Sequence, residues 1–245
     1  MFFRPFRRLY GVYAVAAFTV VIVPVCLLIL AGPSLGFRRA VGRRGVHLAM
    51  WLAGSPIRVR GHEHLPTGPC VCVANHASYL DGLVLTAALP GHFNFLVQHG
   101  AAEWPLIGKT IERMGVSFVN RGSARDAAAA TRELLRRLKA GESFAIFAEG
   151  TFKAEPGLLP FHDGAFAIAA RAEVPVLPAA IRGTRRVFPE GARLPRPGGI
   201  DIELMPAIAP GEGGRHATGA LRDGVRQAIL ARCGEPDSQA ERPLP

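Results

Sequence analysis

The side chains with the clearest catalytic chemistry lie in NHASYLD, the heptapeptide from Asn75 to Asp81. It directly follows the apolar segment CVCVA, so His76 is predicted at the end of a strand and Asp81 in the first turn of a helix. A turn at that junction lets Asp81 accept a hydrogen bond from one imidazole nitrogen, leaving the other to take a proton from an attacking hydroxyl. The two residues are a candidate base and orienting partner, without a nucleophilic serine.

A second polar cluster strengthens this interpretation. The spacing of His76 and Asp81 alone is weak evidence, because about 0.2 such pairs are expected by chance in this composition, and a structural histidine is the alternative. In FAEGTF, residues 147–152, another predicted strand ends in a glycine turn that brings Glu149 and Thr151 to the same sheet edge. Gly150 permits close backbone approach, although a simple strand-ending turn is also consistent with this string.

Alternating short apolar runs and helical patterns predict an α/β domain. Its sheet is expected to be mixed, partly parallel and flanked by helices, with functional loops at the carboxyl ends of the strands. A helix is predicted from an N-cap at Ser123 to Gly141, and an amphipathic helix near Val41–Leu52. The predicted strands are IRVRG from Ile57 and the runs 70–74, 93–97, 116–119, 143–147, 176–181 and 200–204.

The segment Gly11–Ala31 predicts a membrane anchor, because it carries no charge and is about as long as a bilayer-crossing helix. A cleaved signal peptide is disfavoured, since the apolar run exceeds a usual signal core. Arginines on both sides and Pro24 leave two arrangements open, a re-entrant helical hairpin or a single span. We expect residues 1–54 to form the anchor and a basic amphipathic segment, 55–232 the catalytic domain, and 233–245 a disordered tail.

The charge balance also favours a membrane partner. The 245 residues include 29 basic and 19 acidic ones, a formal net charge of +10, which suits a polyanionic surface. Arginines lie close to the apolar segment, so a lipid surface is favoured over nucleic acid. We expect a membrane protein with its catalytic domain on the cytoplasmic face. The four cysteines show no metal or disulfide spacing and are interpreted as buried, reduced thiols.

Four segments in order, NHASYLD, GVSFVNR, FAEGTF and VPVLPA, resemble the motif blocks of the glycerophospholipid acyltransferase superfamily, particularly its 1-acylglycerol-3-phosphate acyltransferases. FHDGAF, residues 161–166, resembles the segment after the third block, so the similarity covers about residues 75–180. The resemblance implies acyl transfer from an acyl-CoA or acyl-carrier protein thioester to the free hydroxyl of 1-acylglycerol 3-phosphate, forming phosphatidate. It implies no metal and no cofactor.

The resemblance also assigns roles to individual residues. It implies that His76 is the general base, that Asp81 orients it, and that Arg121 contacts the acceptor phosphate. Glu149, Gly150 and Thr151 match the third block and are expected to bind substrate; these three lie at the end of one predicted strand. Membrane lipid and a lysophospholipid acceptor are the implied partners.

Two departures from the motif pattern concern the acceptor. Phe152 stands where many lysophosphatidate acyltransferases have a phosphate-binding arginine, and Asn120 replaces an aspartate before Arg121. Lys153 is a candidate substitute cation, although a lysine lacks the bidentate fork of an arginine. The alternatives are therefore another lysolipid acceptor, such as a lysophospholipid or lyso-ornithine lipid, and a catalytically silent lipid-binding protein.

Overall fold

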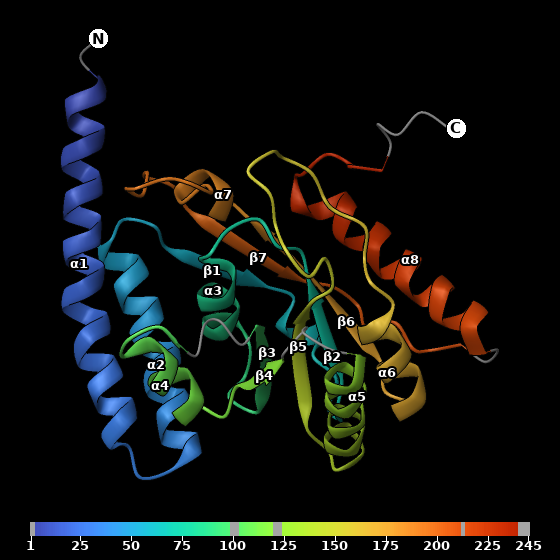
Figure 1. Cartoon of the computed structure of the whole chain (residues 1–245). Coiled ribbons are helices and arrows are strands. Elements are labelled where there is room, and N and C mark those ends of the chain that lie inside the picture. Colours follow the sequence, from blue (N-terminus) through green and yellow to red (C-terminus); the bar gives the residue numbers. More distant parts are fainter. Residues whose placement is uncertain (1–2, 99–102, 120–123, 212–213, 240–245) are drawn as a thin grey trace.

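The computed structural model describes residues 3–98, 103–119, 124–211 and 214–239 (Figure 1). Within them a 3-10 turn, η1 (His62–His64), follows the first strand. The helices are α1 (Phe3–Ala31), α2 (Leu35–Leu52), α3 (Asp81–Ala88), α4 (Ile107–Arg113), α5 (Ala124–Lys139), α6 (Gly164–Ala172), α7 (Thr184–Val187) and α8 (Gly214–Cys233). The strands are β1 (Ile57–Arg60), β2 (Val71–Ala74), β3 (Phe93–Gln98), β4 (Ser117–Val119), β5 (Ser143–Phe147), β6 (Val176–Arg182) and β7 (Ile200–Leu204).

The strands form one seven-stranded sheet in the order β1-β7-β6-β2-β5-β3-β4. Neighbouring strands run parallel, except that β6 and β7 are antiparallel. The predicted fold class, a mixed and partly parallel sheet flanked by helices, is therefore confirmed. Each predicted strand is present, and each of its ends lies within one residue of the predicted end. Short apolar runs bounded by turn residues give a strong strand signal.

Side chains alternate across the sheet and fill two separate cores. On one face Val71 and Val73 of β2 pack with residues of α5, α6 and α8. On the other face Cys72 and Ala74 pack with residues of α2 and α3. Figure 1 shows the same layers, with α1 to α4 on one side of the sheet and α5, α6 and α8 on the other. The four cysteines are free and buried, as expected.

Helices α1 and α2 form a hairpin whose turn lies at residues 32–34. The apolar run continues as helix through Pro24, so the chain does not reverse at the proline. Helix α2 begins earlier than predicted, because the Ser34 hydroxyl caps it by accepting from the Phe37 amide at 3.3 Å. Its glycines weakened the helical pattern but allow close packing: a Cβ at Gly45 would lie 2.5 Å from Val25 Cγ2.

Much of α1 presents apolar side chains to the surroundings. Its segment Phe6–Ala31 is long and apolar enough to cross a membrane: it contains an 18-residue stretch with a mean hydropathy of 2.9, of which 17% is buried. Val20, on its outer face, is 73% exposed. Exposed apolar residues in such number are typical of a surface that contacts lipid or another protein. Membrane association therefore agrees with the structure, while the choice between span and re-entrant hairpin stays a prediction.

The expected disordered tail is wrong for the residues that the structure describes after Cys233. Residues 234–239 pack along the loop between β5 and α6: the Leu158 amide donates to the Pro236 carbonyl at 2.8 Å, and Arg226 pairs with Asp237 at 2.6 Å. The charged residues that suggested disorder instead form ion pairs with the body of the domain. The remaining residues of the predicted tail lie outside the described part of the chain.

Candidate active site

The candidate site lies where β2 and β5 end side by side. The two strands are parallel and in register from Val71 with Phe144 to Ala74 with Phe147. Their carboxyl ends therefore meet at one edge of the sheet, and the residues that follow, His76 and Glu149, come together there. Asn75 links this edge to the neighbouring strand β6. Its side-chain amide donates to the Ile181 carbonyl at 3.0 Å, and its side-chain oxygen accepts from the Ile181 amide at 2.7 Å.

The structure brings His76 and Asp81 into direct contact. The imidazole Nδ1 lies 2.8 Å from Asp81 Oδ2. Since a carboxylate oxygen only accepts, Nδ1 carries the proton and Nε2 is left as the acceptor. The Asp81 side chain is fully buried, whereas the His76 side chain is 19% exposed. A buried carboxylate thus fixes the tautomer of an imidazole that substrate can reach.

The same oxygen of Asp81 organises the turn between β2 and α3. Oδ2 also accepts from the amides of Ala77 at 2.6 Å and Ser78 at 2.7 Å. The Ser78 hydroxyl in turn donates to the Phe188 carbonyl at 2.6 Å. Three donors thus converge on Oδ2 and hold the carboxylate against the ring. The five-residue spacing therefore works because the intervening residues form a compact turn.

Aromatic rings enclose the imidazole. Phe147 stacks on His76 with ring centroids 4.3 Å apart and an interplanar angle of 17°. The ring centroids of Phe152 and His76 lie 4.6 Å apart with an interplanar angle of 59°. Phe152 also makes a T-shaped contact with Tyr79, at a centroid distance of 4.8 Å. Phe152 thus occupies the space beside the candidate base with an uncharged ring. These contacts restrict the imidazole orientation and partly shield it from water.

Glu149 lies beside His76 and accepts from two backbone amides, and its expected contact with substrate stays a prediction. Its carboxylate is 3% exposed and both oxygens accept backbone hydrogen bonds, from the His76 amide at 2.6 Å and from the Leu159 amide at 2.7 Å. Burial raises the pKa of Glu149 to about 7, while the two amide donors oppose that rise. Glu149 therefore braces the backbone at His76 through both of its oxygens.

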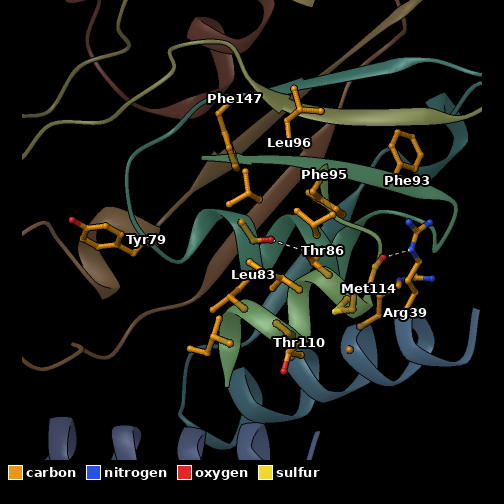
Figure 2. Close-up of a pocket in the computed structure, with 18 of the residues that line it drawn as sticks. Arg39, Tyr79, Leu83, Thr86, Phe93, Phe95, Leu96, Thr110, Met114 and Phe147 are labelled. Carbon is orange, nitrogen blue, oxygen red and sulfur yellow. Dashed lines mark hydrogen bonds between the residues drawn. The ribbon is translucent and has the colours of Figure 1, made fainter. Parts of the chain in front are cut away.

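A large cavity begins at this site and runs beneath the sheet face. Its volume is about 800 Å³, and His76, Tyr79, Phe147 and Phe152 line it, within the range of roughly 300–1,000 Å³ typical of small-molecule pockets. Figure 2 shows Tyr79 at one end and Arg39 at the other, with Phe95 of β3 between them and Phe93 near the Arg39 end. The apolar walls suit a hydrocarbon chain whose reactive end lies at the imidazole.

Part of this cavity wall comes from the predicted anchor. Side chains of α1 and α2 line the cavity alongside those of α3, α4 and β3. Arg39, at the far end, is held by the carbonyls of Met114 at 2.9 Å and Gly91 at 3.0 Å and by Asn94. Helices assigned to separate segments of the chain thus build one pocket. This shared pocket was not predictable from the sequence, because an apolar helix that lines a cavity has the same composition as one that only contacts lipid.

The other residues predicted to bind substrate do not all lie at the large cavity. Gly150, with φ of 73°, and Thr151 line the large cavity. Lys153 does not; it borders a separate cavity of about 290 Å³ beside residues 238 and 239. Arg121 lies outside the described residues.

Ser34 lies in a sequence pattern that is also found around catalytic serines. Gly32–Gly36, GPSLG, has the G-x-S-x-G pattern of serine hydrolases. That pattern requires a strand, a sharp turn and a helix, whereas Ser34 lies between helices α1 and α2 and caps α2. This serine has a structural role.

The comparisons with known proteins agree with this geometry. A family model described as Acyltransferase matches residues 56–182, just over half of the chain. A lyso-ornithine lipid O-acyltransferase of Brucella abortus is 31% identical over 235 residues, covering 92% of this chain and 83% of that protein. The chain therefore belongs to the acyltransferase family.

Several relatives have names that specify an acceptor. The chloroplastic 1-acyl-sn-glycerol-3-phosphate acyltransferase BAT2 of Brassica napus is 36% identical over 55% of this chain and 39% of its own length. The 1-acyl-sn-glycerol-3-phosphate acyltransferase of Borreliella burgdorferi is 31% identical over 60% of this chain and 59% of its own length. The chain thus spans about two fifths to three fifths of these two proteins.

A solved structure shares the complete fold. The crystal structure of the 1-acyl-sn-glycerophosphate acyltransferase from Thermotoga maritima superposes with a TM-score of 0.74 and covers 98% of both chains, at 21% sequence identity. The helical hairpin and the sheet are therefore found together in another protein. At this identity the comparison shows the fold alone.

Proposed function

We propose that this protein transfers a fatty acyl group from a thioester to the free hydroxyl of a lysolipid. The observation that carries the proposal is the contact between His76 Nδ1 and Asp81 Oδ2 at the mouth of an apolar cavity. This arrangement places a base, whose Nε2 is available to accept a proton, beside a cavity that is large and apolar enough for an acyl chain. Family membership supports the same reaction class.

In the proposed reaction, Nε2 of His76 takes the proton of the acceptor hydroxyl as its oxygen attacks the thioester carbonyl. Asp81 stabilises the imidazolium that forms. The tetrahedral intermediate then expels the thiolate, which receives the proton from His76, and an ester and a thiol result. Backbone amides of the residues after Gly150 are proposed donors to the developing oxyanion, since the Gly150 amide itself donates to the Phe147 carbonyl at 3.1 Å. Acyl-CoA and acyl-carrier protein are the proposed donors.

Lysophosphatidate is the first proposed acceptor, with phosphatidate as product. Several relatives carry the corresponding name, and Arg121 is the proposed contact for the acceptor phosphate. Lys153 is the weaker candidate, since it lies outside the large cavity.

Lyso-ornithine lipid is the second candidate acceptor. Phe152 places a ring where a phosphate-binding arginine was expected, 4.6 Å from the imidazole of His76. Two relatives are named lyso-ornithine lipid O-acyltransferases, and one matches nearly the whole chain. An acceptor without a terminal phosphate has no need of an arginine at this position.

An activity matrix on purified protein tests the proposal. Acyl-CoA and acyl-carrier protein thioesters of several lengths are each combined with lysophosphatidate, lyso-ornithine lipid and other lysophospholipids, and ester formation and thiol release are both measured. Turnover with a lysolipid is the expected result. Lipid binding without turnover for any pair would instead identify a non-catalytic lipid-binding protein. Preference for an acceptor that lacks the phosphate would favour the second candidate.

Association with a membrane is proposed for the exposed apolar face of α1, and the cytoplasmic face is the proposed location of the sheet domain. The arginines that flank the apolar run supply attraction to anionic lipid. An acceptor that resides in the bilayer would then enter beside α1, which also lines the cavity.

A further inference from the structure

The segment after α8, residues 234–239, is here called the strap. It lies along the loop between β5 and α6, which Figure 1 shows rising beside the end of α8. Leu158 forms a bridge with Asp237 in parallel orientation, and its carbonyl accepts from the Ser238 hydroxyl at 2.6 Å. Gly157 allows this approach, because its φ is +149° and a Cβ there would meet Ser238 Cβ at 3.3 Å.

Two ion pairs fasten the strap. Arg226 of α8 pairs with Asp237 at 2.6 Å and also donates to the Leu158 carbonyl at 2.8 Å. Arg185 donates to Glu235 at 2.8 Å, and the other Glu235 oxygen accepts from the Gly157 amide at 2.7 Å. The side chains of Arg185 and Glu235 are 14% and 13% exposed, and Arg226 is largely buried beside the more exposed Asp237, so water screens both ion pairs less than it screens fully exposed ones.

The fastened loop continues directly to the candidate active site. Leu159 follows Leu158, and its amide donates to Glu149 Oε2 at 2.7 Å. The other oxygen of Glu149 accepts from the His76 amide at 2.6 Å. A continuous path of hydrogen bonds therefore leads from the strap through Leu159 and Glu149 to the backbone of the candidate base.

We infer that the strap, together with Arg226, positions His76 for acyl transfer by holding the β5–α6 loop so that Leu159 and Glu149 brace the His76 backbone. Arg226 is a positioning residue, since it contacts neither the cavity lining nor His76 directly. The inference rests on the proposed function, since it assigns the strap a part in that same reaction. Loss of the strap contacts lets the loop shift, withdraws a donor from Glu149 and loosens the histidine.

The test compares two arginines one turn apart on α8 in the full-length protein. Arg226→Gln removes the ion pair and replaces the guanidinium that donates to the loop by a shorter amide. Arg222→Gln is the matched control, because among the described residues Arg222 pairs with the exposed Asp163 and Asp223. We expect Arg226→Gln to lower kcat about tenfold, the order for a lost hydrogen bond to a charged group, with KM for donor and acceptor changed less than twofold. Arg222→Gln should keep both constants.

A double variant distinguishes positioning from general destabilisation. Because the path runs through Glu149, Arg226→Gln should lower kcat little further in a Glu149→Gln background. Multiplicative losses, or a kcat of Arg226→Gln within twofold of wild type, would overturn the inference. If Arg226→Gln fails to fold, Ser238→Ala, which removes a single contact, replaces it with the same expected direction.

Hydrogen exchange supplies a readout that does not depend on turnover. Amide protection of residues 75–81 should fall in Arg226→Gln and remain at the wild-type level in Arg222→Gln. Unchanged protection there would contradict the inference even in an active enzyme. Conversely, reduced protection in a protein that acylates no lysolipid would support the positioning path while refuting the proposed function.

Discussion

Replacing Glu149 by glutamine tests whether this residue braces His76 or binds substrate. The carboxylate accepts two short backbone hydrogen bonds, 2.6 Å from His76 and 2.7 Å from Leu159. A glutamine has one acceptor oxygen and one amino group, so one backbone amide would face another donor. A hydrogen bond to a charged group contributes about 1.5–3 kcal/mol, and its complete loss in the transition state lowers kcat by about ten- to hundredfold.

The assay for Glu149→Gln measures initial rates over a range of acceptor concentrations, with the melting temperature as a check of folding. Bracing predicts a lower kcat with little change in KM, because Glu149 is not among the described residues that line the large cavity. A higher KM at unchanged kcat would refute this reasoning and restore the substrate contact that the sequence motif suggested.

The same variant has a signature in the pH dependence of stability. Burial raises the pKa of Glu149 from 4.5 to about 7, so the folded protein binds this proton more tightly than the unfolded chain. The free energy of unfolding therefore contains a contribution that decreases as the pH rises from about 4.5 to about 7, by up to about 3 kcal/mol. Denaturation across this window should show a shallower decrease for Glu149→Gln, and equal slopes would contradict the assignment.

Three further predictions concern the base, the acceptor and the anchor. Asp81→Asn should lower kcat at least about a hundredfold, because the amide no longer stabilises the imidazolium; an unchanged rate and pH profile would remove Asp81 from the mechanism. Phe152→Arg should add a phosphate contact, so the kcat/KM for lysophosphatidate divided by that for lyso-ornithine lipid should be about tenfold higher than in a Phe152→Leu control. An unchanged ratio would show that residue 152 does not determine the choice of acceptor. Deleting the residues before Gly32 should release most of the protein from membranes in high salt, which sedimentation would measure. The deletion should also lower activity, because α1 lines the cavity. Complete retention on membranes would contradict the anchor assignment.

Local pattern was sufficient to predict the strands and the pairing of His76 with Asp81. The CVCVA run becomes β2, and the residues after it form the turn in which Asp81 accepts from His76, Ala77 and Ser78. Such features depend on neighbours in the chain, which a sequence motif records. The parallel alternation of strands and helices further implied that β2 and β5 end at one edge.

Contacts between distant segments were not predictable in the same way. Nothing in the motif string shows that Glu149 uses both oxygens on backbone amides, since the Leu159 amide reaches it only through the path of the β5–α6 loop. Likewise the composition around Pro236 and Asp237 suggests disorder, because their partners Leu158 and Arg226 are distant in the sequence or come from another element. The cavity wall formed by α1 depends on how the hairpin packs against α3 and α4, which hydropathy does not specify.

The central claim is that His76 is the base of an acyl transfer, and the rate of that transfer in His76→Ala tests it most directly. The measurement uses purified protein with the donor and lysolipid pair that gives the fastest wild-type turnover, and His76→Gln serves as a companion that preserves more of the side-chain volume between Phe147 and Phe152. Both variants should fold with a melting temperature near that of the wild type and lose about a hundredfold to ten-thousandfold in kcat. Turnover near the wild-type rate in either folded variant would contradict the account.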